Sequence, residues 1–161
     1  MSNTADYKLL RNSSVCTELH EDEAQTLVEK MGVRELKDGE LLIKEGGSDQ
    51  SLFILVSGKL AVISANSDGK DNAVYTMKEG ECAGTRAFVD RTPRKATLRA
   101  IGNATVYTLT PDDFEKLVDA HPRLAFKVMR ALFRITHTNL MRMNQESQVM
   151  SNYIHKTGGR F

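Results

Sequence analysis

Cysteine, net charge and long apolar runs are all scarce in this sequence. The two cysteines, Cys16 and Cys82, cannot build a disulfide framework and have no metal-ligand spacing, which is typical of a reducing cytosol. The formal net charge is +1 at pH 7, so there is no bulk attraction to nucleic acid or to an anionic membrane. No run approaches the roughly 20 apolar residues that span a bilayer, and the polar N-terminus lacks the apolar centre of a signal peptide. We therefore expect a soluble, cytoplasmic protein without a cofactor.

The residue patterns of the common enzyme classes are absent too. There is no P-loop and no nucleophile elbow, and no paired carboxylates stand out in a segment that would form a pocket. No two of the four histidines have the spacing by which helical histidines bind a metal; they are His20, His121, His137 and His155. We expect no enzymatic activity.

The chain has the size and apolar content of one domain with a helical extension. It has 161 residues, 40% of them hydrophobic, which is enough for a sizeable core. Near the start, three acidic residues (21–23) precede Ala24, Leu27, Val28 and Met31, which recur at helical spacing. Acidic residues suit the positive end of a helix dipole. Residues 1–38 are therefore predicted to be an N-terminal helical segment.

Short β-prone runs follow, separated by glycines at eleven-residue intervals from Gly47 to Gly80. Regular strand and turn spacing of this kind indicates an all-β barrel, roll or sandwich over residues 39–110. A hairpin turn is predicted at residues 67–70. Residues 52–56 are apolar on both faces, so this strand is expected to be buried on both sides. The predicted strands are 41–44, 52–57, 60–64, 73–77, 96–101 and 105–110.

Helical patterns return at the C-terminus. Pro111, followed by two acidic residues, opens a short helix that ends near His121. A long helix from about Pro122 to about His155 follows, which gives a C-terminal helical segment over residues 111–155. Residues 156–161 have no packing pattern and are expected to form a flexible tail.

Residues 80–97 interrupt the strands with chemistry suited to an anion. The segment contains glycines, a potential helical turn, and then an arginine beside a proline. Such a turn can aim several backbone N–H groups at one point. A guanidinium entering from the following strand would add a charge and a two-pronged donor that matches phosphate oxygens.

These residues resemble the phosphate-binding cassette of the cyclic-nucleotide-binding family. The matching positions are Gly80, Glu81, Gly84, Ala87, Pro93, Arg94, Ala96 and Thr97. Similar residues also stand at 39–40, 45–46 and 52–58, so the resemblance covers about residues 20–145. It implies a mainly β fold with flanking helices: an antiparallel, jelly-roll-like β-roll, N-terminal helices and a long C-terminal helix, as in the regulatory domain of the catabolite activator protein.

The resemblance also implies a binding site for cyclic AMP or cyclic GMP. Arg94 would pair with the cyclic phosphate, and backbone N–H groups near Arg86, Ala87 and Lys95 would contact the same group, while Gly84 allows the close turn. The expected ligand-binding residues are Gly84, Thr85, Arg86, Ala87, Arg94, Lys95 and Ala96.

Three departures from the family pattern leave the ligand open. Thr85 stands where the family usually has the glutamate that binds the ribose 2′-hydroxyl, a contact of roughly 1.5–3 kcal/mol. Arg86 and Lys95 add positive charge. The pocket could bind a mononucleotide weakly, take a more anionic ligand such as a cyclic dinucleotide, or be a degenerate site on a protein-interaction module. Arg94 could instead form a structural ion pair with an acid.

The long C-terminal helix carries a heptad seam that predicts a homodimer. Its positions are Phe126, Met129, Phe133, Thr136, Leu140, Met143, Ser147, Met150 and Ile154, and the first two turns are expected to pack on their own domain. By the resemblance, residues near Thr138 and Asn139 would close over a nucleobase. A basic stripe (Arg123, Lys127, Arg130 and Arg134) is interpreted as a solvated face.

The sequence therefore predicts a free-standing sensor that passes its signal to a partner protein. Direct DNA binding is not expected, because residues 156–161 are too few for the helix-turn-helix domain that transcriptional relatives carry after this helix.

Overall fold

The structure, a computed structural model, describes the chain over residues 5–65 and 71–157. Of residues 65, 71, 72 and 143–157 it describes the backbone but not the side chains. The predicted hairpin turn at 67–70 and residues 158–161 of the predicted tail lie outside the described residues.

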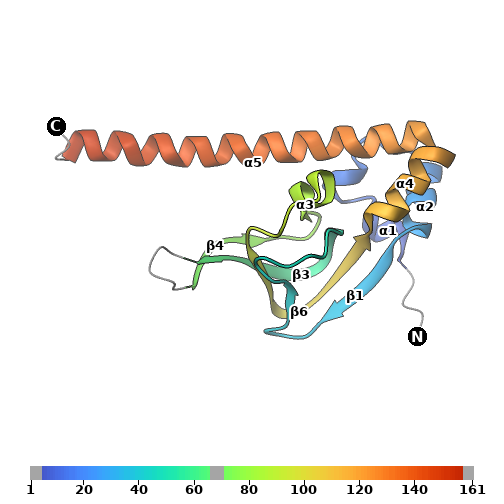
Figure 1. Ribbon diagram of the computed structural model, residues 1–161, viewed down its shortest axis with the longest axis horizontal. Coiled ribbons are helices and arrows are strands. Elements are labelled where there is room, and N and C mark those ends of the chain that lie inside the picture. The colour runs from blue at the N-terminus through green and yellow to red at the C-terminus, as the bar shows by residue number, and fades with distance from the viewer. Residues whose placement is uncertain (1–4, 66–70, 158–161) are drawn as a thin grey trace.

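All the helices except α3 lie towards the two ends of the sequence, and the strands lie between them (Figure 1). The N-terminal elements are α1 (Tyr7–Leu10), the 3₁₀ helix η1 (Ser14–Cys16) and α2 (Glu21–Glu29). The middle of the chain contains β1 (Gly32–Leu36), β2 (Leu41–Ile43), β3 (Leu52–Ala65), β4 (Asp71–Met77), β5 (Cys82–Ala83), α3 (Thr85–Asp90) and β6 (Thr97–Leu109). The C-terminal helices are α4 (Pro111–Ala120) and α5 (Pro122–Thr157).

The strands form one antiparallel six-stranded sheet built on the two long strands β3 and β6. The hydrogen-bonded order is β1-β6-β3-β4, while β2 pairs with β6 and β5 pairs with β3. Because β3 and β6 run across the whole sheet, β2 and β5 can pair with their ends and curl the sheet into a roll. The predicted antiparallel β-roll with flanking helices is confirmed.

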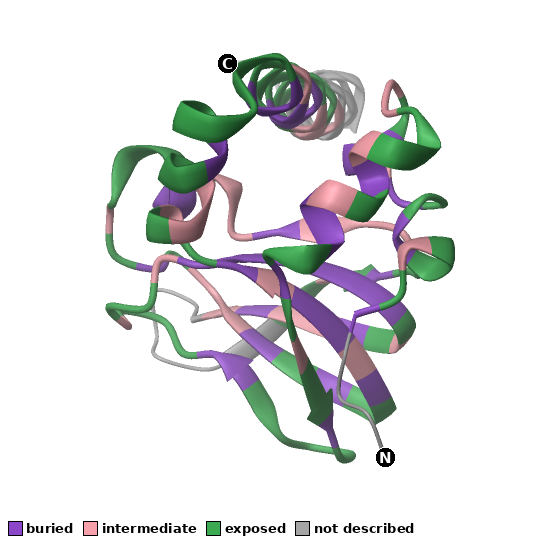
Figure 2. Cartoon of the chain, turned by 90° about the vertical axis from the view of Figure 1, so that its right-hand side faces the viewer, coloured by how far each residue is buried: buried purple, intermediate pink, exposed green. Residues whose placement is uncertain are grey.

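Alternation along β3 creates two apolar cores. Leu52, Ile54 and Val56 face a core shared with the helices, whereas Phe53 and Leu55 face the inside of the roll. All five are buried, as expected for a strand with a period-two pattern that is apolar on both faces. Figure 2 shows where buried and exposed residues lie along the strands.

Two boundaries differ from the sequence prediction. The N-terminal segment is not helical to residue 38, because Gly32–Leu36 forms β1 and pairs with β6. The two pairs of short strands predicted at 52–64 and 96–110 are two continuous strands, β3 and β6. Gly58 interrupts the apolar pattern of β3 at an irregularity in the register, where its φ is +90° and an added Cβ would lie 2.4 Å from the Asn103 carbonyl oxygen.

The helix α5 is fastened to the N-terminal region by ion pairs. Lys127 Nζ lies 2.8 Å from Glu23 Oε1, and Glu18 accepts from both Arg130 and Arg134. Three members of the predicted solvated stripe are therefore paired, although Arg123, Arg130 and Arg134 are exposed as that interpretation expects and only Lys127 is half-buried. Within the described residues, no helix is long and apolar enough to span a membrane.

Candidate ligand-binding site

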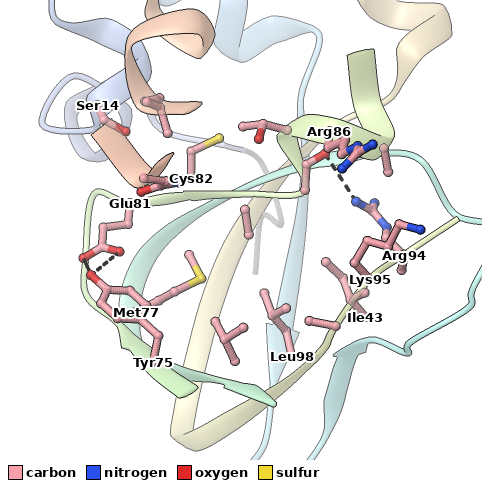
Figure 3. A pocket seen from close by; sticks show the side chains of 18 of the residues that line it. Ser14, Ile43, Tyr75, Met77, Glu81, Cys82, Arg86, Arg94, Lys95 and Leu98 are labelled. Carbon is pink, nitrogen blue, oxygen red and sulfur yellow. Dashed lines mark hydrogen bonds between the residues drawn. The ribbon is translucent and has the colours of Figure 1, made fainter. Parts of the chain in front are cut away.

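A cavity of about 1060 Å³ lies between the roll and α5. Its floor and sides come from strands β2 to β6, and α3 and the loop after it form one end. Residues of η1 and α5 complete the wall. Figure 3 shows Arg86 and Arg94 at one end of the cavity and the Tyr75–Glu81 pair at the other. Apolar side chains such as Ile43, Met77 and Leu98 lie between the two ends.

Gly84 makes the sharp turn that begins α3. Its φ of +85° is left-handed, a conformation that glycine adopts without steric strain. The first helical hydrogen bond of α3 runs from the Phe88 N–H to the Gly84 carbonyl at 3.0 Å. The N–H groups of residues 85–87 precede it and have no acceptor within the helix. They sit on residues that line the cavity, where they can receive an anion.

The Arg94 side chain extends to the turn at Gly84. Its Nη2 donates to the Ser51 carbonyl at 2.6 Å and its Nη1 donates to the Gly84 carbonyl at 3.3 Å. The guanidinium carbon lies 5.5 Å from the centre of the Phe53 ring. The Arg94 backbone is held by the 46–47 turn through bonds of 2.8 and 3.3 Å. Backbone and ring together fix the guanidinium against the start of α3.

The Arg94 guanidinium is a buried cation that forms no ion pair with any carboxylate in the described part of the chain. The residue is only 5% exposed, and desolvation lowers its pKa although Asp49 opposes the shift. Its Nε has no hydrogen-bond partner among the described residues, and no described carboxylate lies within ion-pair distance of it. The alternative of a structural ion pair is thus not what the described part of the structure contains.

The seven residues expected to bind the ligand all line this cavity. Ala87 and Arg94 are buried, and Gly84, Thr85 and Ala96 are half-buried. Arg86 and Lys95 are exposed at its edge. Thr92, which was not predicted, adds a buried hydroxyl without a hydrogen-bond partner in the described structure.

The far end of the cavity was not anticipated from the sequence. The Tyr75 hydroxyl donates to the Glu81 carboxylate, with distances of 2.7 and 2.9 Å to its two oxygens, and this contact raises the pKa of Tyr75. The Arg142 guanidinium from α5 lies 4.2 Å from the centre of the Tyr75 ring. Glu81 belongs to the cassette motif and Tyr75 is only six residues before it, whereas Arg142 is far from both in sequence.

The helix α5 forms the roof of the cavity. Thr138 and Asn139, expected near a nucleobase, both line it. Other α5 residues on the same wall are Ala131, Arg134, Ile135 and Arg142. Their spacing of three and four residues could have identified one helix face, but nothing in the sequence shows which strand end that face covers.

The chemistry of the wall suits an organic anion. Burial raises the pKa of the Cys82 thiol above its ordinary value, so the thiol stays neutral. Among the described residues, no three histidine, cysteine, aspartate or glutamate side chains gather as a metal site would require. The polar groups at the cassette end are donors, and apolar side chains follow them.

The sequence profile of the "Cyclic nucleotide-binding domain" family matches residues 33–121. The chain belongs to the cyclic nucleotide-binding domain family. The match includes the whole cassette and the strands that carry it, and it confirms the family that the cassette residues suggested.

Known proteins resemble this cyclic nucleotide-binding domain in sequence or in fold. The cGMP-dependent protein kinase of Plasmodium berghei (strain Anka) is 32% identical over 105 residues, which are 65% of this chain but 12% of the kinase. A cyclic nucleotide-binding domain from Methylobacillus flagellatus KT superposes with a TM-score of 0.79 at 18% identity, covering 87% of this chain and 79% of that one. The Thermus thermophilus catabolite activator protein gives 0.76 at 20% identity, covering 86% and 63%. The two structural similarities confirm the β-roll fold.

Proposed function

We propose that this chain is a cyclic nucleotide sensor whose ligand phosphate binds Arg94 and the first N–H groups of α3. The Arg94 guanidinium carries the proposal, because it is buried at the cavity wall with an unpaired Nε and no described anionic partner. A buried charge without a partner is unfavourable, and a phosphate would supply the missing charge through paired hydrogen bonds. The cGMP-dependent kinase among the relatives supports cyclic GMP as the ligand.

The rest of the nucleotide would extend from the cassette under α5. Thr138 and Asn139 would meet the base there. Thr85 cannot replace the ribose contact of a glutamate, since its hydroxyl is shorter and uncharged. We therefore expect affinity for a cyclic mononucleotide to be weakened by roughly ten- to hundredfold relative to a glutamate-bearing site.

Contacts from α3 to α4 give the signal a route to α5. The Phe88 and Phe114 rings pack edge to face at 5.4 Å, and Arg91 forms an ion pair with Glu115 at 2.7 Å. The helix α4 in turn packs on α5. A ligand that pulls α3 towards Arg94 would shift this helical unit, to the extent that the ligand prefers one state over the other.

The outer face of α5 is proposed to pair with a second copy of the chain. Phe126, Met129, Phe133 and Leu140 are all exposed, Phe133 by 73%. The expectation that the first turns of the seam pack on their own domain is wrong, because Leu124, Val128 and Leu132 fill that core instead. The last seam positions, 143–154, lie outside the described side chains. A cytoplasmic protein partner would receive the signal from this dimer.

A thermal-shift screen with cyclic AMP, cyclic GMP and cyclic di-GMP tests the sensor proposal. Ligand at one hundred times its dissociation constant should stabilise the protein by about 2.7 kcal/mol. Arg94→Ala should abolish the shift. The matched control is Arg99→Ala, since Arg99 is exposed on β6 and does not line the cavity. No shift with any ligand at millimolar concentration would favour the alternative, a degenerate domain that serves as a protein-interaction module.

A further inference from the structure

The wall of the cavity carries more positive charge than a cyclic mononucleotide can neutralise. Among the described residues its only carboxylate is Glu81, whereas five described cationic side chains line it: Arg86, Arg94, Lys95, Arg134 and Arg142. A cyclic mononucleotide has one phosphodiester and therefore one negative charge. The excess of cations suggests a ligand with more than one anionic group.

Most of these cations have no ion-pair partner among the side chains that the structure describes. Arg134 pairs with Glu18 from the N-terminal region. Of the other four, none has a described carboxylate within ion-pair distance.

The cations that have no described ion-pair partner lie at two separate places in the cavity. Arg94 and Arg86 stand at the cassette end (Figure 3). Arg142 lies against the Tyr75 ring, 4.2 Å from its centre, and Tyr75 is at the opposite end. The ring is held by its hydroxyl bond to Glu81. A guanidinium stacked on a fixed ring keeps its N–H groups in its own plane, where they can bind an anion.

The volume of the cavity agrees with a ligand that spans both ends. At about 1060 Å³ it lies slightly above the range of roughly 300–1,000 Å³ for small-molecule sites. The apolar strip between the ends can accept the flat faces of bases.

We propose that the preferred ligand of this pocket carries two phosphate groups, one bound at Arg94 and the other at Arg142. A cyclic dinucleotide and a nucleoside bisphosphate share this chemistry. The inference rests on the proposed function, since it keeps the first phosphate at Arg94, and it adds Arg142 as the residue that selects the two-phosphate ligand.

Isothermal titration calorimetry with matched ligands tests the inference. The ligands are cyclic GMP with one phosphate, cyclic di-GMP with two, and guanosine 3′,5′-bisphosphate as the linear alternative. We expect at least one of the two-phosphate ligands to bind about tenfold or more tightly than cyclic GMP. Whichever of the two binds more tightly identifies the source of the second phosphate.

The variant Arg142→Gln should remove the preference. We expect it to weaken the two-phosphate ligand about tenfold more than it weakens cyclic GMP. Arg123→Gln is the matched control, because Arg123 is exposed on the same helix and does not line the cavity; it should leave the ratio of affinities unchanged.

The outcomes separate the two proposals. If cyclic GMP binds in an Arg94-dependent way and a second phosphate adds nothing, the inference is overturned and the sensor remains. Equal losses for both ligands in Arg142→Gln would also overturn it. If no nucleotide binds, the proposed function fails together with the inference.

Discussion

Replacing Gly84 with alanine is a direct perturbation of the cassette. Its Cβ would lie 2.5 Å from Arg94 Nη1 and 3.0 Å from the Ser51 carbonyl oxygen. Gly84→Ala should therefore displace the guanidinium and weaken phosphate binding. Two terms add in the free energy of unfolding: about 1–2 kcal/mol for alanine at positive φ, and about 1–3 kcal/mol for the clash with a packed side chain.

Gly39 provides the control for the backbone term. Its φ is also +85°, but an added Cβ would meet nothing within 4 Å. Gly39→Ala should thus lose only the first term, about 1–2 kcal/mol, and keep full ligand affinity. Urea denaturation measures the free energy of unfolding, and titration calorimetry measures the affinity of the same preparations.

A double variant isolates the clash with Arg94. Removing the guanidinium in Gly84→Ala/Arg94→Ala makes room for the Cβ, so the two single losses of stability should not add, with a coupling of at least about 0.5 kcal/mol. If Gly84→Ala were no more destabilising than Gly39→Ala and still bound ligand, the close approach of Arg94 to Gly84 would be refuted.

Two further predictions concern α5. The ion pair with Arg130, and then that with Arg134, lowers the pKa of Glu18, so this carboxylate stabilises the fold at pH values above the ordinary glutamate pKa, and the gain is lost as pH falls below about 4. Glu18→Gln should lower the melting temperature at pH 7 and make the melting temperature fall less steeply in acid. An unchanged dependence of the melting temperature on pH would contradict the pairing. Phe133→Glu should convert the proposed dimer to a monomer in light scattering, because it places a charge on an exposed apolar seam; a dimer that persisted would exclude this face.

The β-roll and its cassette were predictable because both depend on patterns of residues that are close together in the sequence. The apolar residues 52–56 and the glycines and arginine of residues 80–97 follow one another closely in the sequence. The strand β1 was missed because its five residues do not alternate between apolar and polar types, so the sequence lacks the usual pattern of a strand. Gly58 interrupted the pattern of β3, so one strand was read as two.

Contacts between distant residues could not be predicted in this way. The partners of Arg130 and Lys127 are 112 and 104 residues away, so the basic stripe gave no local sign of them. The stacking of Arg142 on Tyr75 likewise depends on where α5 crosses the roll. The cassette end of the site was therefore predictable, and the opposite end, where Arg142 contacts Tyr75, was not.

The Nε–H of Arg94 offers the most direct test of phosphate binding at the cassette. This group is buried without a described partner in the free protein, and its ¹⁵N-resolved NMR signal can be assigned by its loss in Arg94→Lys. We expect titration with the tightest-binding nucleotide to shift that signal with the calorimetric dissociation constant, and guanosine, which lacks a phosphate, to leave it in place. A signal that stays fixed while nucleotide binds would contradict the assignment of the phosphate to Arg94.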